Sequence, residues 1–195
     1  MSVVFTIGHS TRTLDEFLAL LHAHHIVQLA DIRTVPRSRR HPHFSIEALS
    51  KSLPAAGIAY RHMPGLGGLR KPRRDSTNAG WRHPGFRGYA DYMETAEFEK
   101  ALDELMAWAT QAPSPERESL RSSTRSLASG GGAPRAVIMC SEAVWWRCHR
   151  QLVADALVAR GVTVRHIMSA RAAPEHSLTD FARVVDGRVT YPGLI

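Results

Sequence analysis

Short apolar runs alternate with helical patterns along most of this chain. Five runs rich in β-branched residues have the length of buried strands, at residues 3–7, 27–32, 58–63, 136–140 and 162–167. Apolar residues spaced three and four apart predict helices over residues 14–24, 46–56, 89–109 and 145–160. Alternation of this kind is typical of a mostly parallel sheet with helices on its faces. The pattern therefore predicts an α/β sandwich, in which a parallel-rich sheet is flanked by helices.

Local helix and turn signals agree with these boundaries. Thr13 and Glu16 form a capping box ahead of the first helix, and Ser45 is placed to cap the second. Near the C-terminus, Asp186 and Gly187 lie between β-branched residues, which is a hairpin signal. We therefore expect a small antiparallel β-ribbon at the end of the chain.

Residues 111–134 do not follow the alternating pattern. They are rich in Ser, Pro, Gly and Arg, and their few apolar residues cannot bury enough surface to offset chain entropy. We interpret them as a flexible insertion within a single domain that spans residues 1–195. No apolar run approaches the roughly 18–20 residues of a membrane span, and the N-terminus lacks a secretory signal. These features predict a soluble, cytoplasmic protein with no membrane partner.

Positive charge is concentrated in one part of the chain. The segment from residue 33 to residue 87 holds twelve Lys and Arg residues against two acidic ones. A segregated positive region attracts polyanions, so the expected partners are an anionic ligand, a nucleotide or nucleic acid. The alternative interpretation is that these arginines only solubilise two loops.

Polar side chains follow four of the five predicted strands. In an open parallel sheet, ligands bind where the carboxyl ends of the strands lead into helices, so we expect these side chains to share one edge. The candidates are His9 and Ser10 after the first strand, Asp31, Arg33 and Arg39 after the second, His62 after the third, and Cys140, Glu142, Cys148, His149 and Arg150 after the fourth. Asp31 and Arg33 point to the same side of the sheet, where they can pair with each other or hold a substrate.

Cys140 and Cys148 are the only cysteines, and both lie at one strand-to-helix junction. A thiol facing a helix N-terminus and several arginines would have a lowered pKa and could act as a nucleophile or metal ligand. A buried cysteine is also a common core residue. Adjacent helical residues point about 100° apart, so we expect Cys148 and His149, in the first helical turn, not to face the same ligand.

Two further chemistries stay open for this junction. A metal ion could be held by Cys140, Cys148 and a histidine, His149 or His62, although seven residues separate the cysteines. Otherwise the sequence predicts no cofactor. The second chemistry is that of a cysteine phosphatase or a sulfur transferase, but residues 141–146 contain no glycine and two tryptophans. Such a loop cannot readily aim its backbone amides at a phosphate.

Several spaced motifs resemble those of one bacterial family, named domain of unknown function 488. The resemblance rests on the strings TIGHSTRTLDEF, DIRTVPRSRRHPHF, YRHMPGLGG and GFRGYADYM, and on CSE followed by CHR. It runs from Thr6 to about Ile167 and implies an α/β sandwich, but no particular activity. The family pattern nominates Gly8, His9, Ser10, Asp31, Arg33, Pro36, Ser38, Arg39, Phe44, His62, Gly67, Cys140, Glu142, Cys148, His149 and Arg150.

The leading functional hypothesis is an enzyme acting on a nucleotide, nucleic acid or other phosphorylated substrate at the sheet edge. Arginines would bind the anionic groups, while a carboxylate or an imidazole would handle protons. The competing class is a non-catalytic nucleic-acid-binding or regulatory module, which needs an open basic groove rather than a closed pocket. The candidate residues are, as catalytic groups, Asp31, Glu142, Cys140 and His9, and, as substrate-binding groups, Ser10, Arg33, Arg39, His62, Cys148, His149 and Arg150.

Overall fold

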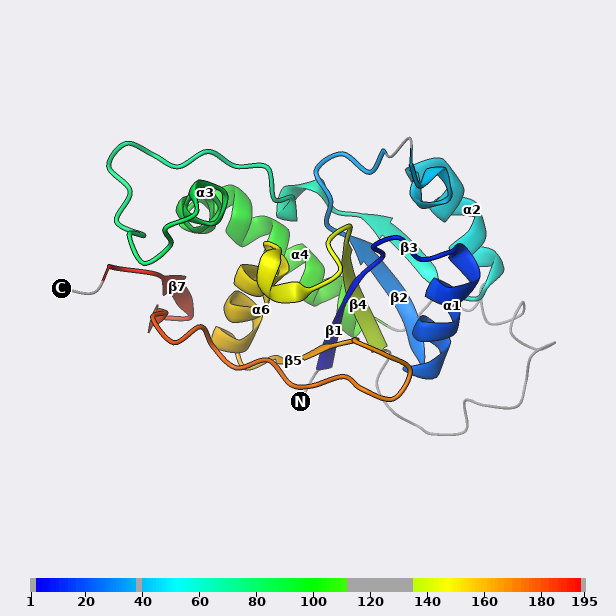
Figure 1. The fold of residues 1–195 in the computed structure, drawn as a ribbon. Coiled ribbons are helices and arrows are strands. Elements are labelled where there is room, and N and C mark those ends of the chain that lie inside the picture. The colour runs from blue at the N-terminus through cyan, green and yellow to red at the C-terminus, as the bar shows by residue number, and fades with distance from the viewer. Residues whose placement is uncertain (1–2, 38–39, 112–134, 194–195) are drawn as a thin grey trace.

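A computed structural model describes residues 3–37, 40–111 and 135–193. Five parallel strands form one sheet in the order β3-β2-β4-β1-β5, and helices cover both of its faces (Figure 1). The strands are β1 (Val3–Gly8), β2 (Ile26–Asp31), β3 (Ala59–His62), β4 (Arg135–Cys140) and β5 (Thr163–His166). The predicted α/β sandwich is confirmed, and each strand lies within one residue of its expected range.

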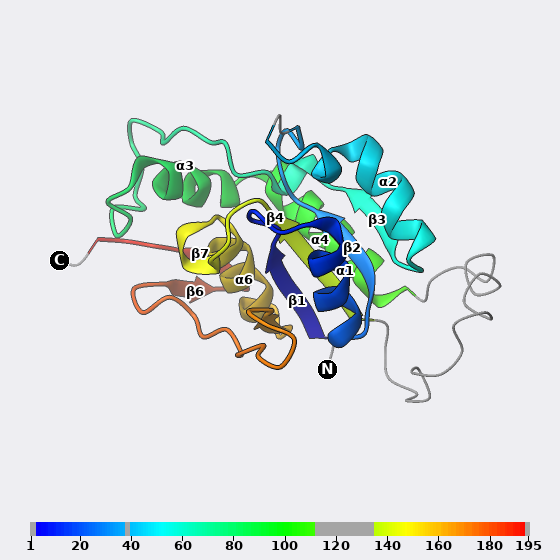
Figure 2. The ribbon, with the colours of Figure 1, turned by 45° about the vertical axis from the view of Figure 1, so that its right-hand side comes forward.

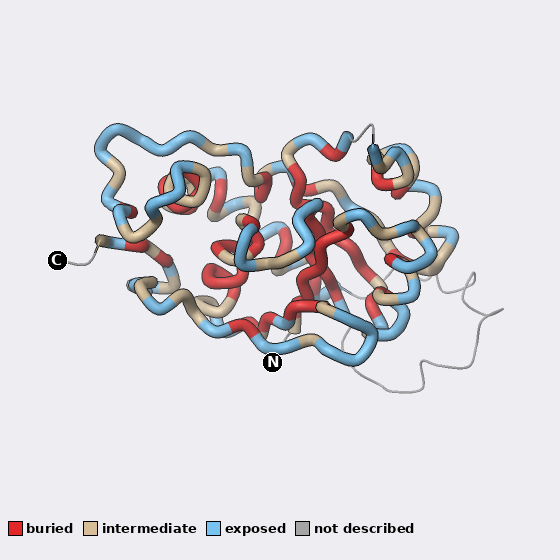
Figure 3. Tube along the Cα trace, in the orientation of Figure 1, coloured by how far each residue is buried: buried red, intermediate tan, exposed pale blue. Residues whose placement is uncertain are grey.

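The helices form two layers, one on each face of the sheet (Figures 1 and 2). One layer holds α1 (Leu14–Ala23) and α2 (Ile46–Ala55), and the other holds α3 (Pro84–Met93), α4 (Ala96–Thr110) and α6 (Arg150–Ala159). Each layer encloses its own apolar core with the sheet, and the central strands are buried along most of their length (Figure 3). A strand covered on both faces requires apolar side chains at successive positions, which explains the continuous apolar runs of the sequence.

The pattern over residues 89–109 is predicted as one helix, and that prediction is wrong. Helix α3 begins at Pro84 and ends at Met93, and a second helix, α4, starts at Ala96. At the break, Thr95 caps α4 by accepting a hydrogen bond from the Phe98 backbone N–H. Apolar residues of both helices pack on the same core, so their spacing runs through the break.

The predicted C-terminal ribbon is confirmed. Strands β6 (Arg183–Val185) and β7 (Arg188–Thr190) pair antiparallel. Asp186 and Gly187 join them with φ values of 50° and 73°, and positive φ at both positions is the mark of a type I′ hairpin turn. The capping box of Thr13 and Glu16 is present as well.

Most of the predicted insertion lies outside the described residues. Of residues 111–134, only Gln111 belongs to the described part, where it follows α4. Across the described ranges, no helix combines the length and the apolar character that crossing a membrane requires.

The chain connections diverge at the neighbouring strands β1 and β4. Strand β1 leads into α1 on one face, whereas β4 leads towards α6 on the other. At the carboxyl ends of the two strands, Gly8 is paired with Cys140. Ligands of open α/β sheets bind in the crevice at such a switch point. Only glycine fits at position 8, because a Cβ atom there would lie 1.8 Å from the carbonyl oxygen of Glu142.

Candidate functional site

A cavity of about 680 Å³ lies at this edge of the sheet. As predicted, the loops that follow the first four strands meet there, and the start of α3 joins them. The described lining comprises residues 9–11, 33–35, 68–69, 140–143 and 147–149, with Arg37, Arg40, His41, His83, Gly85 and Phe86.

The predicted site residues fall into three groups. Seven of them line the cavity, namely His9, Ser10, Arg33, Cys140, Glu142, Cys148 and His149. Asp31, His62 and Arg150 contact residues of these loops but do not belong to the lining. Arg39 lies outside the described residues. An enzyme at this site would need catalytic side chains that converge in the cavity, and of the carboxylates and the thiol predicted for that role, Cys140 and Glu142 line the cavity whereas Asp31 does not.

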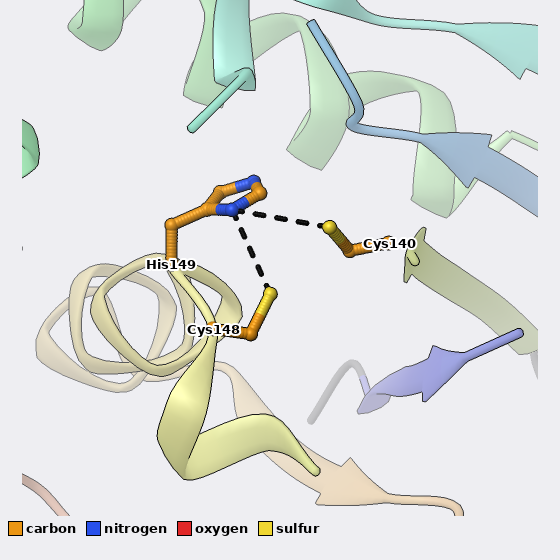
Figure 4. Close-up of side chains that lie close together, drawn as sticks. All are labelled: Cys140, Cys148 and His149. Atoms are coloured by element: carbon orange, nitrogen blue, oxygen red, sulfur yellow. Dashed lines mark hydrogen bonds between the residues drawn. The ribbon is translucent and has the colours of Figure 1, made fainter. Parts of the chain in front are cut away.

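Cys140, Cys148 and His149 form one group, here called the Cys–Cys–His cluster (Figure 4). The Nδ1 atom of His149 lies 4.0 Å from the Sγ atom of Cys140 and 3.6 Å from the Sγ atom of Cys148. The three atoms lie within 4.8 Å of one another. Both thiols are free and buried.

The expectation that Cys148 and His149 point apart is wrong, because they precede the helix. The region predicted as a helix over residues 145–160 begins with a short 3-10 helix, η4 (Trp145–Arg147). Cys148 then has an extended backbone, with φ −136° and ψ 148°, and α6 starts at Arg150. The extended residue brings both side chains to the end of β4, where Cys140 lies (Figure 4).

The imidazole of His149 is held in one orientation. Its Nε2 atom lies 3.2 Å from the carbonyl oxygen of Ile32, and a carbonyl can only accept, so Nε2 is the nitrogen that carries hydrogen. In the neutral ring, Nδ1 then presents its lone pair to the two sulfurs. Gly68 and Tyr89 pack against the same ring.

The two thiols of the cluster differ in acidity. The hydrogen bond from Cys148 holds the pKa of the Cys140 thiol well below its usual range against the effect of burial, and the charge of Arg150 acts in the same direction. The same hydrogen bond, together with burial, raises the pKa of Cys148. Cys140 is thus the more acidic of the two thiols.

Asp31 and Arg33 are joined by a buried two-point ion pair. Arg33 donates from Nη2 to Oδ2 of Asp31 at 2.6 Å and from Nε to Oδ1 at 2.8 Å. Tyr60 also donates to the Asp31 carboxylate, at 2.9 Å. Arg33 Nη1 lies 3.3 Å from Nε2 of His9. In this geometry Asp31 anchors the guanidinium that lines the cavity.

His9 is a neutral side chain of the cavity wall. Burial, followed by the charge of Arg33, lowers the pKa of His9 to about 4. Nδ1 lies 2.9 Å from the backbone carbonyl of Ser10 and donates to it. The ring stacks on Phe44, with 4.2 Å between centroids. The remaining nitrogen, Nε2, therefore accepts the hydrogen bond from Nη1 of Arg33.

Arg150 and His62 support the loops of the cavity. Arg150 is buried and donates to the carbonyl oxygen of Glu142 at 2.6 Å, which fixes the turn after β4. His62 Nε2 donates to the carbonyl oxygen of Arg33 at 2.8 Å and so fixes the turn after β2. The side chain of Glu142 is exposed at the cavity edge.

A buried hydrogen-bond chain, which the sequence did not predict, continues from Arg150 beneath the site. Arg150 donates to the hydroxyl of Thr6, which lies 2.8 Å from Nδ1 of His166. His166 Nε2 lies 3.0 Å from Nδ1 of His176, whose Nε2 donates to Asp155 at 2.9 Å. Because these residues come from separate elements, no local spacing could have indicated the chain.

The fold and the cavity define a class of α/β protein with a Cys–Cys–His cluster at the switch point of its sheet. The chain matches the family described as Domain of unknown function DUF488 over residues 13–114 and 116–157. It belongs to that family, which confirms the resemblance carried by the motifs. The match includes the whole cluster and begins after His9. Searches of curated proteins and of solved structures found no match to the chain.

Proposed function

We propose that this protein is an enzyme that acts on a phosphorylated substrate, such as a nucleotide, inside the cavity. One observation carries the proposal. The buried Cys–Cys–His cluster and four arginines open onto the same cavity. We call the four residues the cavity arginines, and they are Arg33, Arg37, Arg40 and Arg147. The arginines would bind the phosphate of the substrate. The bond that reacts would then lie next to the Cys–Cys–His cluster.

The charge of the cavity favours an anionic substrate. Against the four cavity arginines, the described lining has one carboxylate, that of Glu142, and Asp31 neutralises Arg33 from outside the lining. Arg33 is buried and fixed by Asp31, whereas Arg37, Arg40 and Arg147 are exposed. Two unit charges 4 Å apart interact by about 4 kcal/mol at an effective dielectric constant of 20, so several arginines favour phosphate strongly over a neutral ligand.

A neighbouring hollow offers room for the rest of a nucleotide. It measures about 450 Å³ and shares His83, Phe86, Glu142 and Arg147 with the cavity. Its further lining residue, Trp146, is 49% exposed. Exposed aromatic faces stack nucleobases. A nucleotide could thus place its phosphates at the cavity arginines and its base beside Phe86 or Trp146.

The buried cluster separates this proposal from a non-catalytic binding module. Binding of a polynucleotide needs basic residues along an open groove, and two buried thiols at the base of a cavity add nothing to phosphate affinity. A cysteine of lowered pKa in a cavity is typical of a reactive centre. The cluster therefore supports the enzyme over the module.

Ligand binding by wild type and a triple variant tests the proposal. Inorganic phosphate, pyrophosphate and nucleoside mono-, di- and triphosphates are titrated at low salt, with calorimetry and thermal shift as readouts. We expect at least one nucleotide to bind and to raise the Tm. The triple variant Arg37→Gln, Arg40→Gln and Arg147→Gln should lose this binding without losing stability, because all three side chains are exposed.

A second triple variant controls for total charge. It combines Arg61→Gln, Arg74→Gln and Arg183→Gln, which change three exposed residues outside the described lining. Wild-type affinity in this control supports binding inside the cavity. Equal loss in both triple variants, or no binding of any phosphorylated compound by wild type, would overturn the proposal. Equal loss would point to the open basic surface of a nucleic-acid-binding module.

A further inference from the structure

We propose that the Cys–Cys–His cluster binds one divalent transition-metal ion of the zinc class, with one coordination position open to the cavity. Two sulfurs and an imidazole nitrogen are ligands that zinc prefers. Only the identity of the substrate at the open coordination position depends on the proposed function. The ion site itself rests on the geometry of Cys140, Cys148 and His149.

The distances in the cluster match those of a tetrahedral site. Bonds of about 2.3 Å to sulfur and 2.0–2.1 Å to nitrogen place sulfur and nitrogen about 3.6 Å apart and two sulfurs about 3.8 Å apart. The two sulfur–nitrogen distances here are 3.6 and 4.0 Å, and all three atoms lie within 4.8 Å of one another. Closing the cluster around an ion would shorten the longer sulfur–nitrogen distance by about 0.4 Å and the sulfur–sulfur distance by at most about 1 Å.

The surroundings of His149 are those of a metal-ligating histidine. Such histidines donate their second ring N–H to a carboxylate, a backbone carbonyl or water. Here the carbonyl of Ile32 accepts from Nε2, which leaves Nδ1 as the ligand atom on the side of the sulfurs (Figure 4). Gly68 and Tyr89 pack on the ring and oppose its rotation.

The charge balance also favours a divalent ion. Two thiolates and a neutral imidazole form a neutral complex with an ion of charge +2, so no net charge is buried. Binding displaces the hydrogen that joins Cys148 to Cys140 and releases it to solvent.

The number of ligands indicates a reactive site rather than a structural one. Within residues 3–37, 40–111 and 135–193, these side chains are the one group of three or more His, Cys, Asp or Glu residues close enough to share an ion. Structural zinc sites have four protein ligands, whereas catalytic sites have three and hold water or substrate at the fourth position. The cluster lies in the cavity wall, so the fourth position would face the substrate.

Cobalt titration of the purified full-length chain tests the site. The protein is first treated with a chelator and kept under a thiol reductant, and Co²⁺ is then added with absorbance as the readout. We expect one Co²⁺ per chain, with the visible bands of tetrahedral coordination and a thiolate-to-cobalt charge-transfer band. Zn²⁺ should displace it and abolish both signals. The natural ion is identified by elemental analysis of protein that was never chelated.

Two single variants test proposed ligands, and a third is the control. Cys148→Ser should reduce the charge-transfer band, since one of two thiolates is lost. His149→Gln should weaken Co²⁺ binding more than about tenfold, a loss seen even for outer-shell changes. His22→Gln alters an exposed histidine at the end of α1 and should bind like wild type. Circular dichroism checks that each variant is folded.

The outcomes separate the metal site from the proposed function. Wild type that binds neither Co²⁺ nor Zn²⁺, or Co²⁺ binding that keeps its full spectrum in Cys148→Ser and His149→Gln, overturns the site. If these variants unfold, two measurements on wild type decide whether the site exists. One is the Co²⁺ titration, and the other is whether Zn²⁺ protects both cysteines from alkylation. Metal binding without any phosphorylated ligand upholds the site and overturns the proposed function. Nucleotide binding without metal binding upholds the proposed function and overturns the metal site.

Discussion

Gly68 lies so close to His149 that a Cβ atom at position 68 would stand 2.3 Å from Nδ1. Any side chain at this position must displace the imidazole or its own loop. We therefore expect Gly68→Ala to weaken Co²⁺ binding by about tenfold or more, as loss of an orienting contact does. The measurement is the cobalt titration, with circular dichroism to show that the fold is kept.

Leu69 supplies the control for this prediction. It is the next residue of the same loop and is 78% exposed, so Leu69→Ala should bind Co²⁺ like wild type. Unchanged affinity in Gly68→Ala would show that the position of the His149 ring does not govern binding.

The ion pair of Asp31 and Arg33 should contribute strongly to stability. Asp31→Asn removes the charge that faces a buried guanidinium, and breaking a buried pair from one side costs about 3–5 kcal/mol. We expect a loss of that size in the free energy of unfolding, measured by urea denaturation. Arg73→Gln breaks a pair with Glu94 that is partly exposed and should cost far less, because solvent screens such a pair. Similar losses in the two variants would contradict this assignment.

The sequence predicted the fold well because its signals are local. Strands buried on both faces appear as continuous apolar runs, and the capping box of Thr13 and Glu16 needs only residues three apart. The division between α3 and α4 escaped prediction because Thr95 interrupts the backbone without interrupting the apolar stripe. Local spacing records which side chains are buried, not where a helix breaks.

The site was predicted in part, for a similar reason. The rule for parallel strand ends correctly brought Cys140 and His149 to one edge. The convergence of Cys148 with them depends on a single extended residue after η4, which residue spacing cannot indicate. The contact of Thr6 with His166 joins positions 160 residues apart, so only the folded sheet brings them together.

Stability should decrease with acidification because His166 is buried in its neutral form. Burial, followed by the charges of His176 and Arg150, lowers its pKa to about 3, whereas the unfolded value is about 6.5. Asp155 lies behind His176 and is the carboxylate of this network. Between the two values the unfolded chain binds a proton that the folded chain does not. The free energy of unfolding should therefore fall as pH decreases, by up to about 1.4 kcal/mol per pH unit from this group.

Urea denaturation between about pH 5 and pH 7 measures this slope. His166→Gln removes the titrating group, so the variant should show a shallower dependence on pH, whatever its stability at pH 7. An identical slope in wild type and variant would assign the acid sensitivity to other groups.

Alkylation should distinguish the two thiols of the cluster once metal is removed. The hydrogen bond from Cys148 keeps the pKa of Cys140 well below its usual range, while that bond and burial raise the pKa of Cys148. The thiolate is the reactive species, so iodoacetamide near neutral pH should modify Cys140 first in chelated, folded protein. The two residues are 7% and 6% exposed, so access does not explain a difference.

Peptide mass spectrometry over a time course gives both rates, and protein unfolded in urea is the control in which they converge. Equal rates in the folded protein after metal removal would contradict this difference in acidity between the two thiols.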